Sequence, residues 1–222
     1  MEVGKEALLL RGSGFFVHTL AFTCEAPFRD KKERMLMPRS PILPVIEWEN
    51  VFNSGKTYEE WLAAAELPEH RNTMEHARKT LWFDTQGTWV LPRAVHVVAI
   101  AEDWCGDVVR HVPVLEVIAA GADKLHVRYI SRGQWPDVFA RFLTNGGEAI
   151  PKFIFLNDKF VECGNWGPVP EPCKTLIARG KACGDVAAAR RKVAGFYEAD
   201  HNRRMVFEEL LHMMDIALTS EP

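Results

Sequence analysis

The order of apolar segments in the sequence predicts an α/β fold with a mixed central sheet of about four strands and extra helices at both ends. A near-continuous apolar run at residues 94–101 is typical of a strand buried on both faces. A helical pattern separates it from a second apolar segment at residues 124–130, as in a βαβ unit with parallel strands. Residues 152–163 are predicted to form an antiparallel hairpin with its turn at Asn157 and Asp158, which completes a βαβ-α-ββ order.

The chain is predicted to hold one domain, residues 41–222, after a poorly ordered extension at residues 1–40 in which Met35 or Met37 is an alternative start. The parts expected within the domain are a helical appendage, a core that contains the sheet, and C-terminal helices, at residues 57–86, 94–168 and 170–218.

Local signals place the helices outside the βαβ unit. Thr57 with Glu60 three residues later forms a capping box, which predicts a helix start. Residues 70–83 show helical periodicity, and the face expected to be buried carries Met74, Ala77, Leu81 and Trp82. Pro136 favours the first turn of another helix. Long amphipathic patterns make the remainder from residue 171 helical.

The composition excludes several classes of function. With 47% hydrophobic residues, 26% charged residues and a net charge of -3, the chain resembles an ordinary soluble protein and offers no electrostatic attraction for nucleic acid. The basic cluster Arg190, Arg191 and Lys192 is interpreted as a solvated helix face. No apolar run approaches the roughly 20 residues that span a bilayer, so no membrane association is expected.

The five cysteines are too few and too scattered for a disulfide framework, which favours a reducing cytoplasm. Their spacing does not match a metal site, and no cofactor or metal is expected. Cys24 is interpreted as exposed and incidental, and Cys173 and Cys183 as structural residues of the helical C-terminal part.

A Trp-Cys-Gly-Asp motif, Trp104 to Asp107, follows the first predicted strand at the start of the next helix. A thiol in the first turn of a helix faces unpaired N–H groups and the positive end of the helix dipole. Both favour the nucleophilic thiolate, so Cys105 is the candidate catalytic residue. Trp104 is expected to cover the sulfur in part.

These features resemble the thioredoxin family. Trp104, Cys105 and Gly106 match the family's Trp-Cys-Gly, and Pro113 lies where thioredoxins carry a proline that kinks the helix. The resemblance implies a thioredoxin-like three-layer sandwich in which Cys105 is the reactive residue.

The resemblance extends over roughly residues 57–215 and is greatest to a bacterial branch with a Trp-Cys-Gly-Asp monothiol motif. Two further segments support it, Thr144 to Pro151 and Trp166 to Pro170. It implies that Ile150 and Pro151 form the cis-proline segment opposite Cys105, where a partner peptide would pair with the backbone.

Three departures from the family argue against dithiol chemistry. Val108 replaces the resolving cysteine, so no neighbour can release a mixed disulfide at Cys105. Asp107 competes for the helix N–H groups and repels a thiolate. Ala99 stands where thioredoxins bury a carboxylate used for proton transfer.

Other candidate residues each have two interpretations. Trp166 is either a lid over Cys105 or a core residue, and Cys163 is either a resolving cysteine or, more simply, a small core residue. Arg110 and His111 are expected to face solvent and to take no part in catalysis.

The sequence therefore predicts a thioredoxin-like protein with one reactive cysteine, acting by monothiol thiol-disulfide exchange or redox sensing. Its partners would be protein thiols or disulfides, or glutathione. The alternative is a catalytically inactive module that binds a peptide or protein in the groove near Pro151. A metal or cluster site at Cys105 across a dimer is a distant third interpretation.

Overall fold

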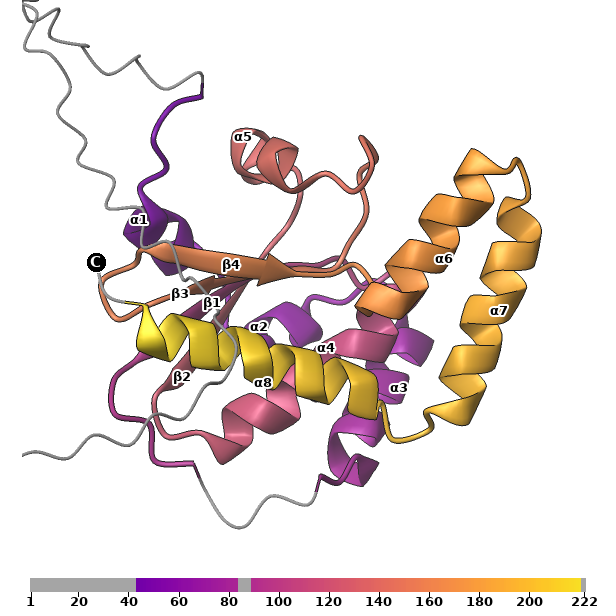
Figure 1. Ribbon diagram of the computed structural model, residues 1–222. Helices are drawn as coiled ribbons and strands as arrows, with labels where there is room; N and C mark the ends of the chain where they lie inside the picture. Colours follow the sequence, from indigo (N-terminus) through magenta and orange to yellow (C-terminus); the bar gives the residue numbers. More distant parts are fainter. Residues whose placement is uncertain (1–42, 84–88, 221–222) are drawn as a thin grey trace, which may run out of the picture. The chain divides into compact units, whose positions relative to one another are not determined.

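The computed structural model of the protein describes residues 43–83 and 89–220 (Figure 1). The predicted extension at residues 1–40, with Cys24, lies outside the described residues. In the described part, no helix is both long enough and apolar enough to cross a membrane.

Among the described residues, four strands form one mixed sheet in the spatial order β2-β1-β3-β4. The strands are β1 (Val95–Ile100), β2 (Leu125–Ile130), β3 (Lys152–Leu156) and β4 (Glu162–Trp166). β1 is parallel to β2 and antiparallel to β3, and β3 is antiparallel to β4. The prediction of a mixed sheet of four strands is confirmed.

The central strands β1 and β3 are the most deeply buried. Every residue of β3 is buried, as is every residue of β1 except His96. The helices α4 (Gly106–Gly121) and α8 (Arg204–Thr219) lie on one side of the sheet, and the short α5 (Pro136–Phe139) lies on the other (Figure 1). A strand covered on both faces needs apolar side chains at successive positions, which explains the apolar runs in the sequence.

Among the described residues, three helices precede the sheet: α1 (Trp48–Asn53), α2 (Tyr58–Ala63) and α3 (Pro68–Thr80). The predicted capping box is present at the start of α2. The Thr57 hydroxyl accepts from the N–H of Glu60 at 3.2 Å, and the Glu60 carboxylate accepts from the N–H of Thr57 at 2.8 Å.

Two details of these helices differ from expectation. The sequence does not predict α1, whose Trp48, Val51 and Phe52 are buried. The prediction for Trp82 is wrong: α3 ends at Thr80, so Trp82 lies beyond the helix and is 69% exposed.

The turn between β3 and β4 is longer than the predicted two residues. The side-chain oxygen of Asn157 accepts from the N–H groups of Lys159 and Val161, both at 3.0 Å, and Phe160 adopts a left-handed backbone conformation with φ 57°. These contacts hold residues 157–161 in the turn, so β4 begins at Glu162 rather than at residue 159.

The α6 (Glu171–Ala182) and α7 (Val186–Ala199) helices form an antiparallel pair between β4 and α8, beyond one end of the sheet (Figure 1). Val169, Cys173 and Val193 form a small apolar cluster of their own within this pair, separate from the main core around the sheet. The α6–α7 pair is therefore an addition to the sheet and its covering helices.

Candidate functional site

Cys105 lies at the N-terminus of α4, five residues after the end of β1. It caps the helix with its carbonyl oxygen, which accepts from the N–H of Val109 at 3.0 Å. Its half-buried thiol donates to the carbonyl oxygen of Ile150, 3.5 Å from Sγ, and the Ile150-Pro151 peptide bond is cis. The structure thus brings Cys105 and the segment before β3 together. Gly106 is not required by packing, because a Cβ there would meet nothing within 4 Å.

Opposing influences set the protonation of Cys105. Burial raises the pKa of the thiol above its ordinary value, and the carboxylate of Asp107 raises it further. The N–H groups of Val108 and Asp107 and the charge of Arg132 lower the pKa, but they do not outweigh burial. The N–H groups of the helix N-terminus therefore act in the predicted direction, and burial has the larger effect on the pKa of Cys105.

Asp107 lies in the first turn of α4 and is partly buried. Burial raises the pKa of its carboxyl, while a hydrogen bond from the Tyr197 hydroxyl, at 3.4 Å, and the charges of Arg110 and Arg190 lower it. The residues at the two other departures from the family are fully buried: Val108 packs in the core, and Ala99 lies in the middle of β1. Neither side chain can take part in thiol-disulfide exchange or transfer a proton.

Trp104 forms an exposed platform beside the thiol. Its side chain is 48% exposed, and the guanidinium carbon of Arg132 lies 5.1 Å from the ring centroid. Arg132 is held there by ion pairs with Glu102 at 3.1 Å and Glu148 at 3.2 Å. Arg132 is not among the residues predicted from the sequence, although it follows β2 by two residues and the carboxyl ends of parallel strands meet at one edge of a sheet.

The segment before Pro151 is tied to the turn that follows β4. Lys152 is only 4% exposed, and its ammonium group donates to the Thr144 hydroxyl at 2.6 Å and to the carbonyl oxygen of Gly167 at 3.0 Å. Gly167 has φ +112°, and a Cβ there would lie 2.1 Å from the carbonyl oxygen of Pro151. The two motif segments recognised in the sequence therefore form one packed unit beside Cys105.

Trp166 belongs to the core. It is buried, its ring stacks on Phe153 with centroids 5.3 Å apart, and its N–H donates to Glu209. It also meets the His111 ring edge-on at 5.4 Å. These contacts fit the core interpretation and not that of a lid over Cys105.

The expectation for His111 is wrong, because the side chain is fully buried rather than facing solvent. Its Nε2 lies 3.2 Å from the Tyr197 hydroxyl, and burial holds its pKa well below the ordinary value. Arg110 also packs against α7, with its guanidinium carbon 4.1 Å from the Tyr197 ring centroid. Both residues join α4 to α7.

The register of the sheet places Cys163 away from Cys105. It follows Glu162, which pairs with Leu156 at the far end of β3 from Pro151. At about 3.3 Å per residue, this places Cys163 roughly 13 Å or more from the thiol site. Cys163 is partly buried against the main core, which fits its interpretation as a small core residue.

The remaining cysteines differ from each other in burial. Cys173 is fully buried, as a structural residue would be, but Cys183 is exposed at the end of α6. The cysteines of the described residues are all free. No group of three or more metal-ligating side chains occurs in the described residues.

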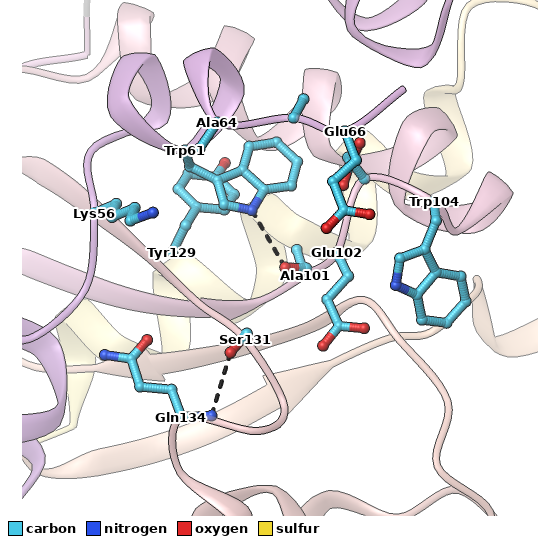
Figure 2. Close-up of a pocket in the computed structure, with 12 residues that line it drawn as sticks. Lys56, Trp61, Ala64, Glu66, Ala101, Glu102, Trp104, Tyr129, Ser131 and Gln134 are labelled. Atoms are coloured by element: carbon cyan, nitrogen blue, oxygen red, sulfur yellow. Dashed lines mark hydrogen bonds between the residues drawn. The ribbon is translucent and has the colours of Figure 1, made fainter. Parts of the chain in front are cut away.

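Figure 2 shows a pocket that Trp104 lines, at the carboxyl ends of β1 and β2. Its volume is about 440 Å³. Trp61 stacks on Tyr129 at 4.8 Å and donates its indole N–H to the carbonyl oxygen of Ala101 (Figure 2). Glu102 contributes an acidic group near Trp104. Neither Cys105 nor Pro151 lines this pocket.

A second hollow, of about 510 Å³, adjoins the thiol more directly. It lies between residues 144–149 and the helical hairpin that α6 and α7 form. We call it the hairpin groove after this pair of helices. Asp107 and Ala149 line the end nearest Cys105, since one follows the cysteine by two residues and the other precedes Ile150.

A mixed four-stranded sheet, a cysteine at the start of the helix after its first strand, and a proline before an antiparallel hairpin define a protein of the thioredoxin-fold class. A sequence model described as thioredoxin matches residues 55–188, more than half of the chain. The chain therefore belongs to the thioredoxin family.

The solved structures that are similar to this chain include the following two. A protein of unknown function from Pseudomonas aeruginosa has a TM-score of 0.56 at 16% identity, covering 77% of this chain and 98% of that one. An HIV epitope scaffold has a TM-score of 0.48 at 17% identity, covering 66% of this chain and 99% of the scaffold. The Pseudomonas protein shares the fold, and at this identity nothing about activity follows. No curated protein matches the chain.

Proposed function

We propose that the protein performs monothiol thiol-disulfide exchange through Cys105. One observation carries this proposal: the free thiol lies at the start of α4 and contacts the carbonyl oxygen of Ile150, the residue before the cis-proline. A partner chain that pairs with the backbone of this segment would bring its own sulfur to Cys105.

The exchange needs an external thiol to complete it. Cys105 first loses its proton to water, and the thiolate attacks one sulfur of a partner disulfide. The partner's S–S bond breaks, and its second sulfur leaves as a thiolate that takes a proton from water. Because Val108 replaces the resolving cysteine, glutathione or a protein thiol then attacks the mixed disulfide and releases Cys105.

The N–H groups of Val108 and Asp107 support the thiolate once it forms, since both lower the pKa of Cys105. Burial opposes its formation in the free protein. The exchange rate should therefore rise with pH through a midpoint above the ordinary pKa of a cysteine thiol.

An insulin-type disulfide reduction assay, run with and without glutathione, tests the proposal. We expect reduction only when glutathione is present, and mass spectrometry should find the mixed disulfide on Cys105. Cys105→Ser should abolish both signals, whereas Cys163→Ser, which removes another partly exposed thiol, should leave them unchanged. An adduct that forms equally on Cys163, or activity that survives Cys105→Ser, would refute the proposal.

A second candidate is a module that binds its partner without turnover. The raised pKa of Cys105 favours it, because a protonated thiol is a poor nucleophile. Under this alternative, Cys105→Ser keeps full affinity for the partner, and the wild-type protein gives no mixed disulfide at any pH.

A further inference from the structure

The hairpin groove carries basic groups on its α6–α7 wall, and the charge of one of them, Arg190, also lowers the pKa of Asp107 at the thiol end. Lys181 at the end of α6 and Arg190 on α7 line it, and both are exposed. Neither forms an ion pair within the described residues. Their charges are therefore available to a ligand.

The other charged groups that line the groove either form ion pairs with neighbouring side chains or lie at the thiol end. Glu148 is paired with Arg132 at 3.2 Å, and Lys174 with Glu171 at 2.9 Å. Asp107 is partly buried and accepts from a tyrosine hydroxyl. The charge on the α6–α7 wall of the groove that forms no ion pair within the described residues is thus positive.

Apolar side chains also line the groove, namely Val169, Ile177, Val186 and Val193. A ligand that fits this surface has carboxylates for the basic groups and apolar groups for these side chains. The volume of about 510 Å³ falls within the range of sites that enclose a short peptide or a small molecule.

The wall formed by α7 is fixed to the helix that carries Cys105. The guanidinium group of Arg110 donates to the carbonyl oxygens of Tyr197 at 3.0 Å and Asp200 at 3.3 Å. The Tyr197 hydroxyl contacts both Asp107 and His111. A ligand held by α7 therefore has a fixed position relative to the sulfur.

We propose that the hairpin groove binds an acidic, partly apolar peptide segment of a protein partner and guides the partner's cysteine to Cys105. The redox part of this inference rests on the proposed function, but the binding part does not. Of the basic cluster seen in the sequence, only Arg190 lines the groove, whereas Arg191 and Lys192 are exposed outside it.

Binding is measured on full-length Cys105→Ser protein, which removes any covalent capture. Fluorescence anisotropy compares two labelled peptides without cysteine, one alternating Glu with Leu and the other alternating Lys with Leu. We expect the Glu peptide to bind roughly tenfold more tightly at low salt, and this preference to fall as salt screens the charges.

A matched pair of charge reversals locates the binding. The double variant Lys181→Glu with Arg190→Glu should lose or reverse the preference, and the double variant Arg191→Glu with Lys192→Glu should keep it. All four residues are exposed, so circular dichroism should show unchanged folding. Equal affinity for the two peptides, or equal loss in both double variants, would overturn the inference. Displacement of the peptide by glutathione disulfide would also overturn it, by identifying a small carboxylate-bearing disulfide as the occupant.

A second measurement separates this inference from the proposed function. With Cys105 intact, the same peptides carrying a cysteine as a 2-pyridyl disulfide report exchange through release of pyridine thione. Exchange at equal rates with both peptides supports monothiol exchange at Cys105 and overturns selective peptide binding in the hairpin groove. Binding of the Glu peptide without any exchange supports peptide binding in the groove and refutes monothiol exchange.

Discussion

Glu116 is a buried carboxyl group on α4, the helix that begins at the thiol site. It is only 5% exposed, and its Oε1 accepts from the Tyr129 hydroxyl at 2.6 Å. Burial raises its pKa from 4.5 to about 7, although the hydrogen bond from Tyr129 lowers it. The folded protein therefore holds a proton on Glu116 over a pH range in which the unfolded chain has released it.

This shift makes stability depend on pH. Because the folded pKa is the higher one, the stabilising contribution is fully present below pH 4.5 and is lost as the pH rises to about 7. A shift of that size corresponds to about 3 kcal/mol in the free energy of unfolding. Glu116→Gln keeps an oxygen for the Tyr129 hydroxyl but stays neutral at every pH.

The stability of Glu116→Gln relative to wild type should therefore rise by about 3 kcal/mol between pH 4.5 and about 7. Urea unfolding followed by tryptophan fluorescence at several pH values measures this difference. A difference that stays constant across the window would refute the reasoning, because it would mean that Glu116 has the same pKa in both states.

Three further predictions concern the site itself. Asp107→Asn removes a carboxylate that raises the pKa of Cys105, so alkylation of Cys105 by iodoacetamide near neutral pH should become several-fold faster. Burial lowers the pKa of Lys152 from 10.5 to about 8, so wild type should gain up to about 3 kcal/mol relative to Lys152→Met as the pH rises through that range, measured by urea unfolding. Gly167→Ala places a Cβ 2.1 Å from the carbonyl oxygen of Pro151 at φ +112° and should cost about 3 kcal/mol or more in the same assay.

Each of these predictions has a matched control. Asp185→Asn, at the exposed N-cap of α7, removes the same charge and should not change the alkylation of Cys105. Lys159→Met, which removes an exposed lysine in the turn after β3, is the control for Lys152→Met. Gly133→Ala, where a Cβ meets nothing within 4 Å, should cost little. If a control variant shows the same change in alkylation rate or stability as the variant it is paired with, the explanation given for that variant is contradicted.

The central part of the fold could be predicted because its signals are local. The apolar run at residues 94–101 corresponds to β1, and the capping box at Thr57 sets the start of α2. The end of the β3–β4 turn could not be predicted, since the Asn157 side chain fixes it by accepting from two N–H groups further along the chain. A two-residue turn and this longer one begin with the same residues.

The residues of the candidate site could be predicted from the sequence better than the pKa of its thiol. The motif and the resemblance identify Cys105 and Pro151, but the net pKa of the thiol depends on how deeply packing buries it. The hairpin groove could not be read from the sequence, because it requires the position of α6 and α7 relative to residues 144–149.

The placement of α6 and α7 between the edge strand β4 and α8 has a consequence for how the protein can diversify. The main core passes through β4 and α8, and the pair contributes its own small cluster. Its outward residues can therefore change without altering the register of the sheet or the start of α4. Under the two proposals above, partner selection and thiol chemistry would depend on separate stretches of one chain. Substitutions on α6 and α7 would then change the partner and leave the reactive centre as it is.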